Sequence, residues 1–392
     1  MGEQHLLRAD PQLRRKAAFF EEFWNGDGAF PILFAKPHLA LGRNYLVHDL
    51  VQQHADVEKL LAEALAQARA AADRGDDGIP VARADLGTTL FPSGLGLRTS
   101  LSENAHPWLV EHLELSRYAG LDRPLDGLAG RGEFPLAGAF YRRLEEERTG
   151  GRLPVPVLPY VPDNQGVFDL THLVVGSDVF YAVADDPATL LAAQERSLEL
   201  FLAGSRWFKD LVGEDAGSMV HGHGMPSGVW FPDTGIRVSE DSCTLISAAD
   251  IRRYCLPFIE RAIRPFGRGF LHFCGRHEDF LRMAVEHPLV STINLGNPEL
   301  YDLEEVFSWC GRTGTVFFGH VARAGGEDNE AWLERLAGMC GRTGCRLILV
   351  AAHAAADATA DAADATGPAA SASDLGRLVS RWHALTRPRP RA

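Results

Sequence analysis

Two possible metal ligands, His272 and Cys274, stand two residues apart in the apolar stretch 270–274. The stretch is rich in strand-forming residues and Gly275 closes it, which predicts a short buried strand followed by a helix. Residues two apart in a strand point to the same face, so both side chains project together at its carboxyl end. Imidazole and thiolate are ligands that zinc prefers. The alternative interpretation is a core histidine beside a buried free cysteine, because free cysteine is among the most buried residue types.

The elements that position this pair are predicted to be strands that alternate with helices. The strand candidates are 81–86, 155–161, 218–225, 236–241, 270–274, 292–295, 316–321 and 347–352. Strands alternating with helical patterns imply parallel pairing, and eight such units imply a closed (β/α)8 barrel of the TIM type. A doubly wound open sheet is the alternative, although no GxGxxG motif follows a strand in this chain.

Changes in pattern along the chain predict its organisation. Residues 1–78 carry two helical patterns and are predicted to form a helical N-terminal cap on a barrel that spans 79–353. Residues 354–373 are almost entirely Ala, Asp, Thr, Gly and Ser, which offers too little apolar bulk to pack, so a low-complexity linker is predicted there. Residues 374–392 are predicted to be a short amphipathic helix and a basic tail.

Composition narrows the classes of partner. Of the 392 residues 46% are hydrophobic, which suffices for one large core or two ordinary ones. Lys and Arg number 39 against 52 Asp and Glu, and the net charge of −13 gives no basic footprint for nucleic acid or an anionic membrane surface. The six cysteines form no CxxC pair, and the sequence shows no signal peptide and no transmembrane run. We therefore expect a cytoplasmic protein that acts on a small-molecule substrate.

In a barrel of this kind the active site lies at the carboxyl ends of the strands. The candidate residues at the predicted strand ends are Asp85, His221, His223, Asp241, His272, Cys274, Asn294, His320 and His353. Strand ends converge over the barrel mouth, so His353 is predicted to complete a zinc site with His272 and Cys274 that keeps one position open. His221 and His223 also share a face, but the glycines around them favour a substrate-contacting or structural role.

These residues resemble the uroporphyrinogen decarboxylase superfamily, which includes the decarboxylase and the zinc-dependent methyltransferases that act with corrinoid proteins. The resemblance runs over about 79–353 and rests on 236–242, 245–247, 254–257, 271–275, 164–169, and Asp85 with 94–96. Among these, 236–242 resembles the acidic strand end of the family, and 271–275 resembles its HxCG element. The resemblance implies a (β/α)8 barrel, in agreement with the strand count.

Two departures from the family pattern bear on the activity. The decarboxylase carries an Arg-rich N-terminal signature that binds the carboxylates of its substrate, and nothing similar stands near 13–16. Few cationic residues are visible at the predicted strand ends, which argues against a substrate with many carboxylates. The methyltransferases are known for a later Cys as the third zinc ligand, and the matching position here holds Ala352 and His353.

Three functions are consistent with this resemblance. The first is a zinc-dependent methyltransferase that moves a methyl group from a corrinoid on a partner protein, or from a small molecule, to a thiol. In that case His272, Cys274 and His353 bind zinc and Asp241 and Asp85 orient the substrate or handle protons. The substrate contacts would come from His221, His223, Asn294 and His320. The second is a metal-free tetrapyrrole decarboxylase that uses Asp85, and the third is a barrel that binds a tetrapyrrole or corrinoid without turnover.

Overall fold

The computed structural model describes Leu7 and residues 10–36, 42–121, 125, 127–351 and 372–388. Its largest sheet has six strands, all parallel, in the order β1-β12-β11-β10-β9-β8. These strands are β1 (Ile32–Phe34), β8 (Ile236–Ser239), β9 (Gly269–Phe273), β10 (Val290–Leu295), β11 (Val316–His320) and β12 (Leu347–Ala351). The predicted strands from 236 onward are therefore confirmed, as is their parallel pairing.

A second sheet has the order β5-β2-β7-β6 and contains the earlier strands. Its members are β2 (Ile79–Ala82), β5 (Leu158–Pro159), β6 (Met219–His221) and β7 (Ser227–Phe231). The interpretation of 218–225 as one more parallel strand is wrong, because β6 pairs antiparallel with β7 and β7 pairs antiparallel with β2. The physical reason is a tight turn: His223 and Gly224 both adopt left-handed backbone conformations, with φ of 48° and 79°, and return the chain at once.

The region 1–78 supplies more than the predicted helical cap. It contains α2 (Pro11–Asn25), α3 (Leu50–Ala55) and α4 (Val57–Arg74), but also β1, which pairs parallel with β12. β1 has three residues, which is too short to show the hydrophobic periodicity of a strand. The sequence pattern alone therefore does not distinguish it from a connection between two helices. A further hairpin of β3 (Thr99–Ser102) and β4 (Ala105–Leu109) lies in the long excursion after β2.

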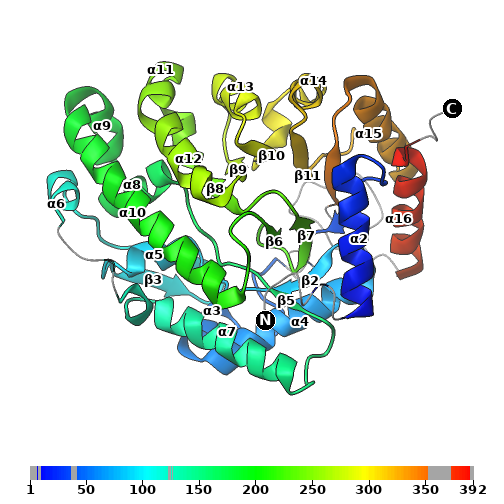
Figure 1. The fold of residues 1–392 in the computed structure, drawn as a ribbon, viewed down its shortest axis with the longest axis horizontal. Helices are drawn as coiled ribbons and strands as arrows, with labels where there is room; N and C mark the ends of the chain where they lie inside the picture. Colours follow the sequence, from blue (N-terminus) through cyan, green and yellow to red (C-terminus); the bar gives the residue numbers. More distant parts are fainter. Residues whose placement is uncertain are drawn as a thin grey trace.

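Helices cover the outside of the strands, as Figure 1 shows. They are α5 (Leu90–Ser93), α6 (Leu115–Ala119), α7 (Phe134–Thr149), α8 (Val167–Val175), α9 (Asp178–Asp185), α10 (Pro187–Val212), α11 (Ala248–Asp250), α12 (Leu256–Ile263), α13 (Glu278–Glu286), α14 (Leu303–Thr313), α15 (Asn329–Thr343) and α16 (Ala372–Thr386). No single helix within the described ranges is long and apolar enough to cross a membrane. Only α8 and α9 taken together have the length and apolar composition of a membrane span, and the two helices are bent by 111° relative to each other.

Two hydrophobic cores lie on opposite faces of the strands. The larger one fills the space between strands and helices. The smaller one collects side chains from β1, β2, β5, β9, β11 and β12 around the β6–β7 hairpin, among them Leu33, Val81, Leu158, Val229, Phe270, Phe318 and Ile348. The hairpin thus occupies the middle of the molecule (Figure 1). In the described part of the chain the strands form separate ladders, so closure into an eight-stranded barrel stays a prediction.

The C-terminal helix α16 packs on the main body. Trp382 is fully buried, and Nε2 of His383 lies 2.9 Å from Oδ2 of Asp77 in the loop before β2. A helix is therefore present where the sequence predicts one. The predicted linker up to residue 371, like His353 before it, lies outside the described residues.

A buried carboxylate, Asp76, joins β1 to the second sheet. It accepts hydrogen bonds from the backbone N–H of Phe34 at 2.9 Å and of Gly78 at 3.0 Å, and from the hydroxyl of Ser227 at 2.8 Å. Burial raises the pKa of Asp76, while Lys16 opposes that shift. The three donors have no substitute acceptor if this carboxylate is removed, and unpaired buried donors are costly.

We therefore expect Asp76→Ala to lower the free energy of unfolding by about 3 kcal/mol, measured by urea denaturation. Asp73→Ala is the matched control, because that carboxylate is exposed and, among the described residues, pairs with Arg69 alone. Its effect should stay within about 0.5 kcal/mol. Equal effects of the two substitutions would show that Asp76 does not hold β1 in place.

Candidate metal centre

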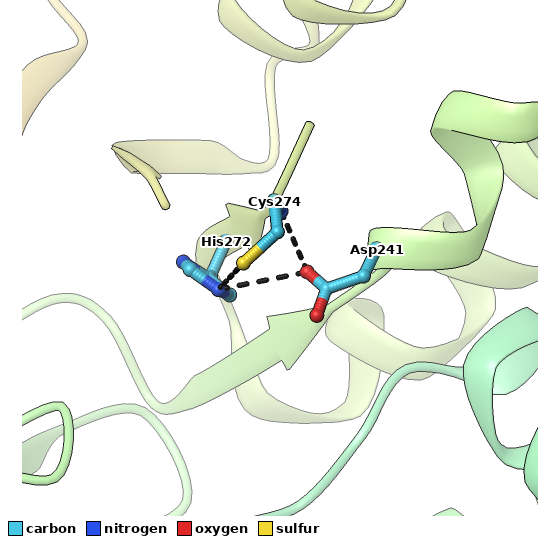
Figure 2. A group of neighbouring side chains, drawn as sticks. All are labelled: Asp241, His272 and Cys274. Atoms are coloured by element: carbon cyan, nitrogen blue, oxygen red, sulfur yellow. Dashed lines mark hydrogen bonds and ion pairs between the residues drawn. The ribbon is translucent and has the colours of Figure 1, made fainter. Parts of the chain in front are cut away.

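His272 and Cys274 come together at the end of β9, as the two-residue spacing predicts. Nε2 of His272 lies 3.5 Å from Sγ of Cys274. The His272 side chain is buried, whereas Cys274 follows the last residue of the strand and is half-buried. Figure 2 shows both side chains turned toward the same point beyond the strand. The predicted proximity of the two ligand atoms is thus present in the structure.

Asp241 supplies a third ligand atom from the neighbouring strand end. It follows β8, which pairs with β9 so that Ser239 faces His272. Its Oδ1 accepts the backbone N–H of Cys274 at 2.7 Å and lies 3.5 Å from Nε2 of His272 (Figure 2). One oxygen, one nitrogen and one sulfur atom from these residues all lie within 4.8 Å of one another. Carboxylate, imidazole and thiolate together are a donor set that fits zinc.

The sequence analysis gave Asp241 a role with the substrate, whereas the structure places it with the two predicted metal ligands. His353, the predicted third ligand, lies outside the described residues, so its membership of the set stays a prediction. With Asp241 present, the described chain already offers three protein ligands, the number that a catalytic zinc site uses.

A pair of buried carboxylates fixes the backbone on which Asp241 stands. Asp169 on α8 accepts the N–H groups of Asp241 at 2.8 Å and Ser242 at 2.7 Å. Glu240 in turn accepts the N–H group of Asp169 at 3.0 Å, at the first turn of α8. Burial and the nearby Asp241 raise the pKa of Asp169 to about 7. Glu240 thus caps the first turn of α8, and Asp169 caps the turn that follows β8. These reciprocal hydrogen bonds hold the end of β8 against α8.

Asn294 determines which nitrogen of His272 is free. Its Nδ2 donates to the carbonyl oxygen of Phe318 at 2.5 Å, so its Oδ1 is left as an acceptor. That oxygen lies 2.5 Å from Nδ1 of His272, which must therefore carry the proton. The lone pair of Nε2 then points toward Cys274 and Asp241. Asn294 was expected to contact substrate, but the structure places its amide against His272 and the backbone of β11.

Burial sets the protonation of both ligands in the metal-free protein. Burial, and then the charge of Arg237, lowers the pKa of His272 to about 4, although Asp241 opposes the shift. Burial, and then Asp241, raises the pKa of Cys274 to about 12. At neutral pH the imidazole is a ready ligand, whereas the thiol keeps its proton. A metal ion must displace that proton to bind sulfur.

A cavity of about 230 Å³ opens beside these three residues. It is lined by Arg83, Thr88, Asp163, Gln165, His221, His223, Gly224, Arg237, Ser239, Asp241 and His272. Arg83 and Arg237 both line this cavity. The expectation that few cationic groups reach the strand ends is therefore corrected. The sequence contained part of the signal: Arg237 and Ser239 stand two residues apart in the predicted strand, so they share one of its faces.

The other predicted site residues divide between this cavity and its surroundings. His221 is buried and packs edge-on against the rings of Tyr160 and Phe270, each with a centroid distance of 5.5 Å. The ring centroid of His223 lies 4.5 Å from that of His272. Both histidines therefore line the cavity next to the candidate metal centre, which is where a substrate contact was predicted. That role stays a prediction.

Asp85 and His320 lie at the edge of this arrangement. Asp85 pairs with Arg83 at 2.7 Å and with Lys36 at 3.4 Å. Burial alone would raise the pKa of Asp85, but Arg83 and then Lys36 outweigh it and hold the pKa well below its usual range. His320 ends β11, two strands from β9, and its Nδ1 lies 3.1 Å from the carbonyl oxygen of Val350. Their predicted catalytic and substrate roles stay predictions.

The architecture is similar to that of an enzyme of known structure. A methyltransferase from Methanosarcina mazei superposes with a TM-score of 0.64 and 13% sequence identity, over 94% of this chain and 98% of that chain. At this identity the likeness shows a shared fold. The chain matches no protein-family profile and no curated protein sequence.

We predict that purified protein binds about one zinc per chain and that Cys274→Ala loses it, because the variant lacks the sulfur donor. Metal content by mass spectrometry after dialysis measures the effect. Cys340→Ala is the control, since it removes a buried thiol from α15 and should keep the zinc. Folded wild-type protein that takes up no zinc when the metal is supplied would contradict this assignment.

Asn294→Ala should weaken zinc binding about 10- to 100-fold, because His272 loses the acceptor that fixes its tautomer. Competition with a chelator of known affinity measures the change. His320→Ala, at the end of a strand of the same sheet, should leave the affinity unchanged. The role of Asn294 is disproved if the two variants bind zinc equally well.

Zinc affinity should rise with pH by about tenfold per unit between roughly pH 6 and 9. The direction of this pH dependence follows from the pKa shifts of His272 and Cys274. His272, with its pKa lowered to about 4, is neutral throughout this range, so only Cys274, with its pKa raised to about 12, must lose a proton. Chelator competition at several pH values checks the slope. A slope near zero would mean that the thiolate is not a ligand.

Proposed function

We propose that this chain is a zinc-dependent methyltransferase of the uroporphyrinogen decarboxylase superfamily, with a small thiol as methyl acceptor. The observation that carries the proposal is the group Asp241, His272 and Cys274 at the edge of a cavity of small-molecule size. The fold shared with a methyltransferase supports it. The proposal includes closure of the strands into a (β/α)8 barrel, with His353 near the same mouth.

A zinc ion held by Asp241, His272 and Cys274 would lower the pKa of an acceptor thiol, so that the thiol reacts as a thiolate at neutral pH. The residues of this chain prepare that step. Asn294 presents the Nε2 lone pair of His272, and Asp169 fixes the backbone that carries Asp241. The cavity next to them would hold the acceptor within reach of this group.

The methyl group would come from a corrinoid on a partner protein or from a methylated small molecule. In the reaction the thiolate sulfur attacks the methyl carbon and forms a new carbon–sulfur bond. At the same time the bond that joins this carbon to cobalt, or to another leaving group, breaks. With a methylcorrinoid the products are a methyl thioether and cob(I)alamin, because both electrons of the broken bond stay with cobalt. Asp85, held by Arg83 and Lys36, is proposed to orient the acceptor through Arg83.

Tetrapyrrole decarboxylation fits the cavity less well. Arg83 and Arg237 supply cationic groups that such a substrate needs, but the cavity of about 230 Å³ lies below the range of roughly 300–1,000 Å³ typical of drug-sized ligands. A tetrapyrrole is larger than those ligands. The same volume argues against a barrel that encloses a corrinoid, so a corrinoid would approach from outside the mouth.

We predict that zinc-loaded protein transfers the methyl group of methylcobalamin to a small thiol. Cobalamin absorbance follows the loss of the cobalt–carbon bond, and mass spectrometry identifies the thioether. Cys274→Ala should lower the rate by about 100-fold or more, because thiol activation is lost. Cys340→Ala should retain it. Wild-type and Cys274→Ala rates that agree, or no thioether from any donor, would refute the assignment.

A further inference from the structure

We propose that Gly296 is a positioning residue for the sulfur atom of Cys274. Gly296 directly follows β10, and its lack of a side chain leaves the space in which the thiol lies beside His272 and Asp241. The inference rests on the proposed function, because it concerns the sulfur ligand of that same centre. Gly296 itself offers no ligand atom and acts through Cys274.

The need for this space follows from one close approach. A Cβ atom at position 296 would lie 2.3 Å from Sγ of Cys274, and 3.2 Å from both Cα and Cβ of that residue. Non-bonded heavy atoms rest at about 3.5–4.0 Å from one another, so a methyl group here and the thiol cannot share the observed arrangement. The sulfur is the atom that must move, because it is the nearest atom and the mobile end of its side chain.

The backbone conformation of Gly296 does not by itself require glycine. A left-handed conformation is the usual reason for a glycine in a turn. Gly275, the neighbour of Cys274, has such a conformation with φ of 87°, whereas Gly296 lies outside that region. The close approach to the thiol is therefore the reason why position 296 has no room for a side chain.

Hydrogen bonds keep the ends of β9 and β10 from separating. The N–H group of Gly296 donates to the carbonyl oxygen of Phe273 at 2.9 Å, and the N–H group of Gly275 donates to Oδ1 of Asn297 at 3.0 Å. These bonds hold the residues on both sides of Cys274 against the segment that follows β10. An added methyl group at position 296 is therefore accommodated by rotation of the Cys274 side chain.

Rotation of that side chain would remove the sulfur from the candidate metal centre. Sγ of Cys274 lies 3.5 Å from Nε2 of His272 (Figure 2). A tetrahedral zinc ion, with Zn–S of about 2.3 Å and Zn–N of about 2.1 Å, places two such ligand atoms about 3.6 Å apart, so the observed spacing is already that of a ligand pair. The next staggered rotamer lies about 120° away and carries the sulfur roughly 3 Å from this position.

A crystal structure of metal-free Gly296→Ala tests the displacement directly. We expect the distance from Sγ of Cys274 to Nε2 of His272 to exceed 3.5 Å by at least about 1 Å. Gly341→Ala is the matched control, because the methyl group that it adds on α15 meets no atom within 4 Å outside its own stretch of helix. Cys274 should keep the wild-type rotamer in the control. A sulfur that has not moved in Gly296→Ala would overturn the proposal.

Metal binding gives a second measurement. Gly296→Ala should weaken zinc binding about 10- to 100-fold, measured by competition with a chelator. The cobalt-loaded variant should also lose most of the near-ultraviolet absorption that arises from charge transfer between thiolate and cobalt(II), which a purely structural role of Gly296 would leave intact. Gly341→Ala should match the wild-type protein in both measurements. Wild-type zinc affinity and cobalt absorption in Gly296→Ala would overturn the proposal.

A combined variant decides the case in which Gly296→Ala does not fold. In a Cys274→Ala background the sulfur is absent, so a methyl group at position 296 no longer displaces it. The double variant should therefore fold and melt within about 3 °C of Cys274→Ala alone. A double variant that also fails to fold would overturn the proposal, because the clash would then lie with the backbone.

The proposed function and the role of Gly296 fail in different ways. Wild-type protein that takes up no zinc would overturn the proposed function, whereas a displaced sulfur in metal-free Gly296→Ala would still support the role of Gly296. Wild-type zinc binding and methyl transfer in Gly296→Ala would overturn the role of Gly296 and support the proposed function.

Discussion

The hydrogen bond from the backbone N–H of Cys274 to Oδ1 of Asp241, 2.7 Å long, joins the ends of two adjacent strands. It brings a carboxylate, an imidazole and a thiol to one point, although the three come from 34 residues of chain. Asp169 on α8 supports this bond, because its carboxylate accepts the backbone N–H groups of Asp241 and Ser242. Without that support, a half-exposed aspartate would lose this geometry to solvent.

A second layer of contacts gives the centre its chemical character. Asn294 stands directly beside His272 in the β9–β10 register and is oriented by the carbonyl of Phe318. The same burial that keeps His272 neutral also keeps Cys274 protonated. In the metal-free protein the imidazole nitrogen can therefore bind a metal ion directly, whereas the thiol must first lose its proton. Binding of a cation and release of the thiol proton are thereby linked.

The β6–β7 hairpin explains why this centre has a cavity of limited size beside it. The hairpin fills the interior with Val229, Phe231 and their neighbours, and its left-handed turn at His223 and Gly224 brings His221 and His223 into the lining of the cavity. The cavity is what remains between this turn and the polar ends of β2 and β8. The hairpin therefore limits the size of the molecule that the cavity can hold.

The sequence by itself determined the strands from 236 onward and the pairing of His272 with Cys274, because alternation and two-residue spacing are local properties of a strand. It also placed Arg237 and Ser239 two residues apart in one predicted strand, and therefore on the same face. Only the tertiary structure decided that Asp241 lies beside His272 and Cys274 and that Asn294 contacts Nδ1 of His272. It also decided that β1 pairs with β12 at the edge of the parallel sheet and that 218–225 turns back as a hairpin. Those outcomes depend on contacts between residues distant in sequence, on burial and on backbone turns, which no short pattern of residue types encodes.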